Sequence, residues 1–116
     1  MMLNIDIECR RGIFFVRLNG ILNNETIYKI KEEVLDIIQI NGIKYLVFNF
    51  EDLCYIDTSG IKLLKKISKS IKNNYGNIYV CGIKSNIVRN KILNSNILEY
   101  IKEINGELSI LKQMQL

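Results

Sequence analysis

The sequence predicts an α/β domain built on a mixed central sheet of four to five strands with about four α-helices. The first indication is the apolar run Tyr45–Phe50, which is followed by a helical pattern and then by a second apolar run, Ile78–Cys81. This is the order of a parallel strand, helix, strand unit with a right-handed crossover. The second indication is an amino terminus that alternates polar and apolar residues. With 116 residues, 48% of them hydrophobic, and no proline, the chain suits one ordered domain over residues 1–116.

Two strands are expected at the amino terminus. Residues Leu3 to Glu8 place an apolar side chain at every second position, which indicates a strand with one wet face and favours the edge of the sheet. Residues Ile13 to Leu18 form a more apolar strand, and Asn19-Gly20 is expected to end it. The short Arg11-Gly12 connection predicts an antiparallel hairpin between the two strands.

A first helix is expected after the hairpin. Asn23 or Asn24 can accept hydrogen bonds from the free N–H groups of a helix start. The apolar residues that follow recur three or four positions apart, which is the spacing of one buried helix face. They are Ile27, Ile30, Val34, Ile37 and Ile38. Asn41-Gly42 then ends this helix.

The central strand, helix and strand follow in order. Tyr45–Phe50 is nearly all apolar, which is typical of a strand covered on both faces, and we expect it at the centre of the sheet. The next helix has an apolar stripe at helical spacing, while its lysines face water. The stripe consists of Ile61, Leu64, Ile67 and Ile71. Asn73, Asn74 and Gly76 end the helix before the strand Ile78–Cys81.

The carboxyl-terminal third contains a weaker pattern. Ser85 is expected to cap a shorter helix that contains Val88 and Ile92. The tail from Ile97 to Leu116 holds two apolar segments separated by Asn105-Gly106. These segments predict a short strand or extended piece and then a terminal helix.

Composition excludes several classes of function. The chain has no histidine, which rules out Ser-His-Asp triads, Cys-His pairs and most zinc chemistry. Cys9, Cys54 and Cys81 are far apart, and we expect reduced, partly buried thiols rather than a metal or redox site. No metal and no cofactor are expected. Because no apolar run approaches the ~20 residues that cross a bilayer, we expect a soluble, cytoplasmic protein without membrane insertion. The net charge of +4 arises from acidic and basic residues mixed along the chain, which does not indicate direct nucleic acid binding.

The stretch YIDTSG, residues 55–60, lies at the carboxyl end of the expected central strand, where reactive groups gather in α/β sheets. Asp57, Thr58 and Ser59 can all cap a helix, a role that stabilises it by ~1 kcal/mol. The alternative is a hydroxyl that is presented for modification. Ser59 excludes the Asp-Thr-Gly motif of a dimeric aspartic protease. A phosphoaspartate receiver is also excluded, because residues 18–20, Leu-Asn-Gly, stand where its magnesium ligands would be.

Three longer stretches resemble a known family. They are FFVRLNGILNNET, KYLVFNFEDLCYIDTSGIKLLKKI and GNIYVCGI, within a span from Leu3 to about Met114. The most specific pattern is a buried strand, Asp52-Leu53, a short spacer, Asp57, two hydroxyl residues and Gly60 before an amphipathic helix. The chain resembles a STAS domain of the anti-sigma factor antagonist type, closest to the sporulation and stress-response antagonists.

The resemblance implies a switch in which this chain is a substrate and not an enzyme. In the family the first hydroxyl after the aspartate, which is usually serine, is phosphorylated by an anti-sigma factor that is itself a kinase. That position is Thr58 here, and Ser59 is the alternative acceptor. The unmodified form is expected to bind the anti-sigma factor and free a sigma factor, the modified form to release it, and a phosphatase to reverse the modification. A monomer or weak dimer is expected.

The resemblance also implies a partner-binding surface around the acceptor. Asn23 stands where many antagonists carry an aspartate, and this difference is expected to alter partner contacts without touching the acceptor. The expected partner-binding residues are Asn23, Tyr55, Asp57, Thr58, Ser59, Gly60 and Lys62.

Two rival functions remain open. One is a STAS subunit that docks onto a membrane transporter ATPase without any phosphorylation switch. The other is RNA binding by a basic face, which requires aromatic side chains among the charges. Tyr75 and Tyr79 alone give this second alternative little support.

Overall fold

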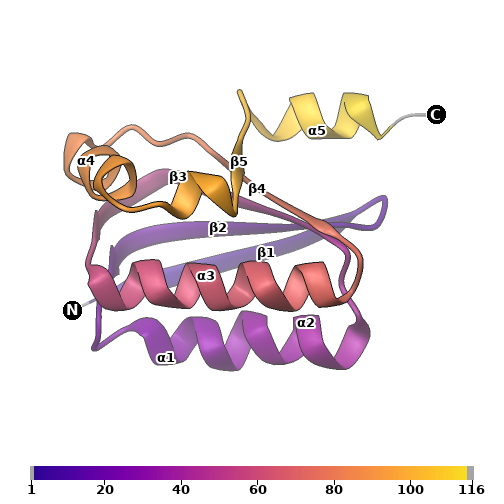
Figure 1. Ribbon diagram of the computed structural model, residues 1–116, viewed down its shortest axis with the longest axis horizontal. Helices are drawn as coiled ribbons and strands as arrows, with labels where there is room; N and C mark the ends of the chain where they lie inside the picture. The colour runs from indigo at the N-terminus through magenta and orange to yellow at the C-terminus, as the bar shows by residue number, and fades with distance from the viewer. Residues whose placement is uncertain (1, 115–116) are drawn as a thin grey trace.

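The computed structural model describes residues 2–114, and Figure 1 shows a five-stranded sheet with helices on both faces. The strands follow one another in the sheet in chain order, from β1 to β5. They are β1 (Leu3–Arg10), β2 (Ile13–Leu22), β3 (Tyr45–Ile56), β4 (Asn77–Cys81) and β5 (Lys102–Glu103). β1 and β2 are antiparallel, and all other neighbours are parallel. The mixed sheet, the amino-terminal hairpin and the central position of β3 are confirmed.

The helices correspond to the expected segments. One continuous helical stretch consists of α1 (Ile27–Ile30), a π turn, η1 (Lys31–Leu35), and α2 (Asp36–Asn41). It ends at Gly42, whose φ of +62° is the left-handed conformation that glycine adopts without strain. The remaining helices are α3 (Thr58–Asn73), α4 (Asn86–Asn94), the 3-10 turn η2 (Ile97–Glu99) and α5 (Glu107–Gln113). Ser85 caps α4 by accepting a hydrogen bond from the N–H of Val88 at 3.2 Å, as expected.

Side chains alternate between two apolar layers. Phe14, Val16 and Leu18 of β2 pack under the helices α1 to α4, together with Phe48 of β3. Ile13 and Phe15 point to the opposite face, where α5 covers them with Ile110 and Leu111. In Figure 1, the continuous stretch from α1 to α2 runs side by side with α3 across one face, while α5 lies apart from them. The larger core therefore lies between the sheet and the helices α1 to α4, and a smaller core lies between the sheet and α5.

Two strands, β2 and β3, are at least four residues longer than the sequence predicted, whereas β1 and β4 differ from it by one or two residues. β2 continues through Asn19-Gly20 to Leu22, with irregular register at this point. β3 continues past Phe50 to Ile56, because its last residues pair with this extension of β2, up to the pair Leu22 and Ile56. The expected short spacer after Asp52-Leu53 is therefore strand. Because β3 is extended, α3 starts beyond the carboxyl end of β4, which pairs with β3 only as far as Asn49.

The cysteines lie in different environments. Cys81 is buried beneath α5, and burial raises the pKa of its thiol to about 11, which keeps it protonated at neutral pH. Cys9 and Cys54 are free and exposed, so the expectation of partly buried thiols is wrong for these two residues.

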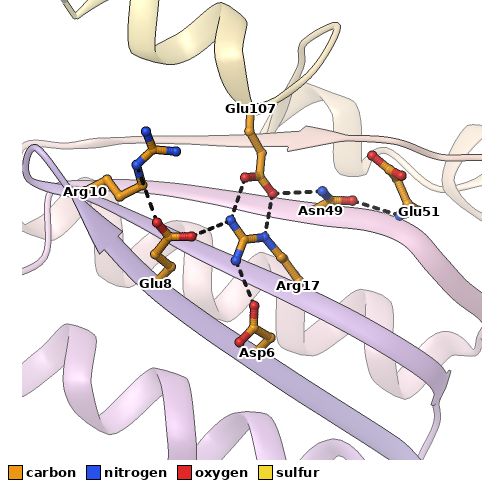
Figure 2. Close-up of polar contacts among 7 residues, drawn as sticks. All are labelled: Asp6, Glu8, Arg10, Arg17, Asn49, Glu51 and Glu107. Atoms are coloured by element: carbon orange, nitrogen blue, oxygen red, sulfur yellow. Dashed lines mark hydrogen bonds and ion pairs between the residues drawn. The ribbon is translucent and has the colours of Figure 1, made fainter.

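Arg17 of β2 links α5 to the antiparallel strands β1 and β2 (Figure 2). Its guanidinium donates two hydrogen bonds to Glu107, the first residue of α5, from Nε at 2.9 Å and from Nη2 at 2.8 Å. The same group binds Asp6 at 2.7 Å and Glu8 at 2.8 Å, both on β1. Asn49 donates a further hydrogen bond to Glu107 at 2.8 Å. One cation thus ties β1, β2 and α5 together.

The attachment of α5 is expected to weaken in acid. The hydrogen bond from Arg17 lowers the pKa of Glu107, and the bond from Asn49 adds to this against the opposing effect of burial. A lowered pKa in the folded state gives stability that is present above the ordinary glutamate pKa of about 4.3 and lost as pH falls through the lower, folded value. Between pH 6 and pH 3 the wild type should therefore lose about 1 kcal/mol more unfolding free energy than Glu107→Gln. Urea unfolding at several pH values measures this difference, and parallel curves would contradict it.

Candidate functional site

Asp57 joins the start of α3 to the loop that precedes α1. One carboxylate oxygen, Oδ1, accepts a hydrogen bond from the N–H of Gly60 at 2.9 Å, which caps α3. The other, Oδ2, accepts one from the N–H of Asn24 at 3.1 Å, although Asn24 is 33 residues away in the chain. The backbone N–H of Asp57 donates to the carbonyl of Leu22 at 3.1 Å. The cap predicted from the sequence is confirmed, and it also fixes a second loop.

Asn23 shapes this second loop from within. Its side-chain oxygen accepts hydrogen bonds from the N–H groups of Glu25 at 2.9 Å and Thr26 at 3.2 Å, in the turn just before α1. The Thr26 hydroxyl in turn donates to the carbonyl of Ile21 at 2.8 Å. Asn23 is only 8% exposed, whereas its neighbour Asn24 is exposed. The N-cap of α1 is Thr26, without a side-chain cap hydrogen bond, so the expectation that Asn23 or Asn24 caps this helix is wrong. The Asn23 side chain instead holds the loop before α1 in place.

Thr58 and Ser59 lie on opposite flanks of α3. Thr58 is exposed and lines a cavity of about 280 Å³ between α3 and α4, whose other wall includes Lys91. Ser59 is half-buried and lines a cavity of about 250 Å³ between α1 and α3, beside Lys31. The two hydroxyls are adjacent in sequence, yet they face different surroundings. Lys62 is exposed and lines both cavities.

Gly60 is buried against the strand ends. A Cβ at this position would lie 2.7 Å from Cγ1 of Ile56 and 3.0 Å from Cγ of Leu22. A Cβ in this first turn of α3 would force Ile56 or Leu22 to shift, so packing within the chain favours glycine here. Ile56 is 1% exposed and belongs to the core, while the preceding Tyr55 is 42% exposed. Tyr55, Thr58 and Lys62 therefore form the exposed part of the expected partner surface.

Residues from α4 complete the site. Lys91, Asn94 and Ser95 line the cavity beside Thr58. The Ser85 hydroxyl, at the start of α4, donates to the carbonyl of Cys54 at 3.2 Å and so ties this helix to the end of β3. The sequence contained no local signal for these contacts, because α4 starts 28 positions after Thr58. Asn24 was missed as a binding partner of Asp57 for the same reason.

The chemistry available at this site is that of an accessible hydroxyl beside lysines and one carboxylate. Within residues 2–114, no three Cys, Asp or Glu side chains are grouped so that they can hold a metal ion. In the same range, no helix is both long and apolar enough to cross a membrane. The lysines and the start of α3 create a positive environment beside the Thr58 hydroxyl.

The fold and the site define a class of small α/β domain that presents hydroxyl groups where its central strand leads into a helix. The family model of the STAS domain matches residues 4–109, and the chain belongs to the STAS domain family. Its sequence is 28% identical over 89 residues to the anti-sigma F factor antagonist of Paenibacillus polymyxa, covering 77% of this chain and 76% of that protein. It is also 28% identical over 89 residues to the anti-sigma-B factor antagonist of Staphylococcus aureus, covering 77% of this chain and 82% of that protein.

Solved structures of SpoIIAA share the fold. The unphosphorylated form of this anti-sigma factor antagonist matches with a TM-score of 0.74 at 17% identity, covering 99% of this chain and all of that one. The phosphorylated form of the Bacillus protein matches with a TM-score of 0.73 at 20% identity, with 95% and 99% covered. The STAS resemblance inferred from the sequence is confirmed.

Proposed function

We propose that this chain is an anti-sigma factor antagonist whose binding is switched off by phosphorylation of Thr58. In its unmodified form it binds an anti-sigma factor kinase in the cytoplasm, and the sigma factor held by that kinase is released. The observation that carries the proposal is the position of Thr58, an exposed hydroxyl on the first residue of α3, held there by the Asp57 cap. The names of the matched relatives support the partner class.

The geometry supports Thr58 over Ser59 as the acceptor. A kinase must bring its nucleotide phosphate in line with the attacking hydroxyl, which requires open access from the outside. Thr58 is exposed, while Ser59 is half-buried on the flank that faces α1. With no histidine in the chain, the general base for this transfer is expected from the kinase. The chain is then a substrate and a binding partner, and a phosphatase restores it.

A phosphate on Thr58 is compatible with the fold. It adds a charge of roughly −1.5 to −2 at a helix amino terminus, where the macrodipole and free N–H groups favour anions. The fold of α3 should therefore persist, and the effect should fall on the interface. The proposed contact surface consists of Tyr55, Asp57, Thr58, Ser59 and Lys62, with Asn23 and Gly60 fixing its shape.

The test is capture of the partner together with mapping of the modified residue. The purified chain is used as bait in a lysate of the native cell, and each captured ATP-binding protein is then incubated with the chain and ATP. We expect an anti-sigma factor kinase that phosphorylates the chain, with the phosphate located on Thr58 by fragmentation mass spectrometry. Phosphate on Ser59 would move the acceptor by one residue and overturn that assignment. Capture of a transporter ATPase, with binding unaffected by Thr58→Glu, would replace the switch by a docking function.

A further inference from the structure

The charges of this chain are segregated, contrary to the expectation of an even mixture. The segment Thr58 to Leu98 contains eight basic residues and not one aspartate or glutamate. The rest of the chain holds the other eight basic residues and all 12 acidic ones. Five of the eight are lysines on α3. The basic segment comprises α3, β4, α4 and most of η2, so half of the protein's cations belong to one continuous region.

A groove follows α3 along its flank toward α4 and η2. The cavity of about 280 Å³ beside Thr58 shares Lys65 with a second cavity of about 390 Å³, which extends to Lys72 and Tyr100. A third cavity of about 420 Å³ shares Lys72 and Tyr100 with the second and reaches β4, but it is also lined by Glu99 and Glu103, so the basic part of the groove ends at Lys72. Since α3 has 16 residues, the groove accompanies a helix of about 24 Å.

Tyr100 forms the wall opposite α3 in the middle of this groove. Its ring lies 5.7 Å from the ammonium nitrogen of Lys65 and 5.5 Å from that of Lys72, both at cation–π distance. The buried Ser68 of α3 donates a hydrogen bond to the Tyr100 carbonyl at 3.2 Å, which holds η2 against the helix. The exposed Leu98 of η2 lines the third cavity. The groove therefore combines ammonium groups with an ordered aromatic wall and nearby apolar side chains.

The lysines of α3 have no acidic partner within residues 2–114. The ion pairs in this range use Arg10, Arg17, Lys84 and Arg89 as cations. The carboxylates of these pairs lie on the sheet strands and on α5. Lys62, Lys65, Lys66, Lys69 and Lys72 thus present uncompensated charge along one helix. Such a field attracts and orients anionic partners.

We propose that the groove between α3 and the α4–η2 segment is a docking surface for an acidic segment of a polypeptide that also carries apolar side chains. The docked segment is expected to be acidic, because its carboxylates would complement the unpaired lysines of α3. A concave path beside a helix fits a chain that lies along it, whereas a flat lipid surface would reach only its rim. The face of Tyr100 is occupied by two lysines and is not free for base stacking, which argues against RNA.

Thr58 lies at one end of this groove, which couples docking to modification. This coupling rests on the proposed function, whereas the docking surface does not. A phosphate on Thr58 would stand beside Lys62 and Lys91 and compete with the acidic segment for them. Docking of such a segment and phosphorylation of Thr58 are thus expected to be mutually exclusive.

The test uses a designed probe and the whole chain. The probe is a fluorescein-labelled amphipathic peptide of about 15 residues with glutamates on one helical face and leucines on the other. Its binding is measured by anisotropy to the wild type, to Lys65→Gln/Lys69→Gln/Lys72→Gln, and to the matched control Lys31→Gln/Lys44→Gln/Lys112→Gln. All six lysines are at the surface, and both variants lose the same charge. Circular dichroism and thermal unfolding establish that each variant is folded.

We expect the groove variant to bind the peptide about 10-fold more weakly than the wild type, and the control to remain within about 2-fold. A probe with glutamine in place of glutamate, or serine in place of leucine, should also lose affinity. Equal loss in both lysine variants would mean that only net charge attracts the peptide, and the docking surface would be rejected. Tighter, groove-dependent binding of single-stranded RNA or of phosphatidylglycerol vesicles would overturn the choice of a polypeptide. Peptide binding without capture of any kinase would leave this surface standing and remove the proposed switch.

Discussion

Thr58→Glu is expected to weaken binding to the anti-sigma factor kinase by about 100-fold. In the free protein, water screens the new carboxylate from Asp57, but in the complex the partner would exclude that water and leave two like charges in a desolvated interface. Asp57 cannot move away, because both of its carboxylate oxygens are bonded within the chain, to Gly60 and Asn24. A like-charge contact at an interface costs several kcal/mol, and ~3 kcal/mol corresponds to about two decades in affinity. Calorimetric titration of the purified kinase with each variant measures the effect.

Two further variants separate charge from size and from position. Thr58→Gln has nearly the same shape as Thr58→Glu without the charge, and we expect it to weaken binding by less than about 10-fold. Ser59→Glu places a charge on the flank toward α1, near Lys31 and Lys62, and we expect a loss below about 5-fold. If Ser59→Glu were as disruptive as Thr58→Glu, the partner would contact Ser59 as closely as Thr58, and the preference for Thr58 would be unsupported. Equal effects of glutamine and glutamate would show a steric mechanism in place of an electrostatic one.

Periodicity predicted most of this fold because α3 buries one continuous stripe and β3 is buried on both faces. Both patterns were visible in the sequence: Leu46, Phe48 and Phe50 of β3 pack with α3 in the larger core, and Val47 lies in the smaller core beneath α5. The extensions of β2 and β3 were not visible, because residues 51–56 mix exposed and buried positions and pair with β2 alone beyond the end of β4. The π turn at Lys31–Leu35 also left no trace, since its apolar spacing is the same as that of the surrounding helix.

The candidate site was predicted in its location but not in its surroundings. Asp57 as a cap follows from the order of residues around a helix start, which is a local property. The bond from Asn24 to Asp57 depends on the register that places Leu22 beside Ile56, and register between distant strands is not a local property. The different exposure of Thr58 and Ser59 likewise depends on where α1 and α4 pack against α3. Tertiary packing therefore supplies the observation that favours one hydroxyl over its neighbour.

Gly60→Ala is expected to lower the free energy of unfolding by about 2 kcal/mol, which would assign this glycine to packing. Alanine normally favours a helix over glycine by about 1 kcal/mol, so crowding has to outweigh a gain before any loss is seen. The new methyl group would meet Ile56 and Leu22, which are both fully buried and cannot turn away without opening the core. Urea unfolding measures the change.

The matched control is Gly106→Ala, because nothing lies within 4 Å of a Cβ at Gly106 and its φ of 175° is accessible to any residue. We expect this variant to stay within about 0.5 kcal/mol of the wild type. If Gly60→Ala proved as stable as the wild type but bound the kinase poorly, close approach of the partner's backbone would be the reason for glycine at this position. If Gly60→Ala is less stable than the wild type but binds the kinase equally well while both are folded, Gly60 belongs to the scaffold that supports Thr58. It is then not part of the contact itself.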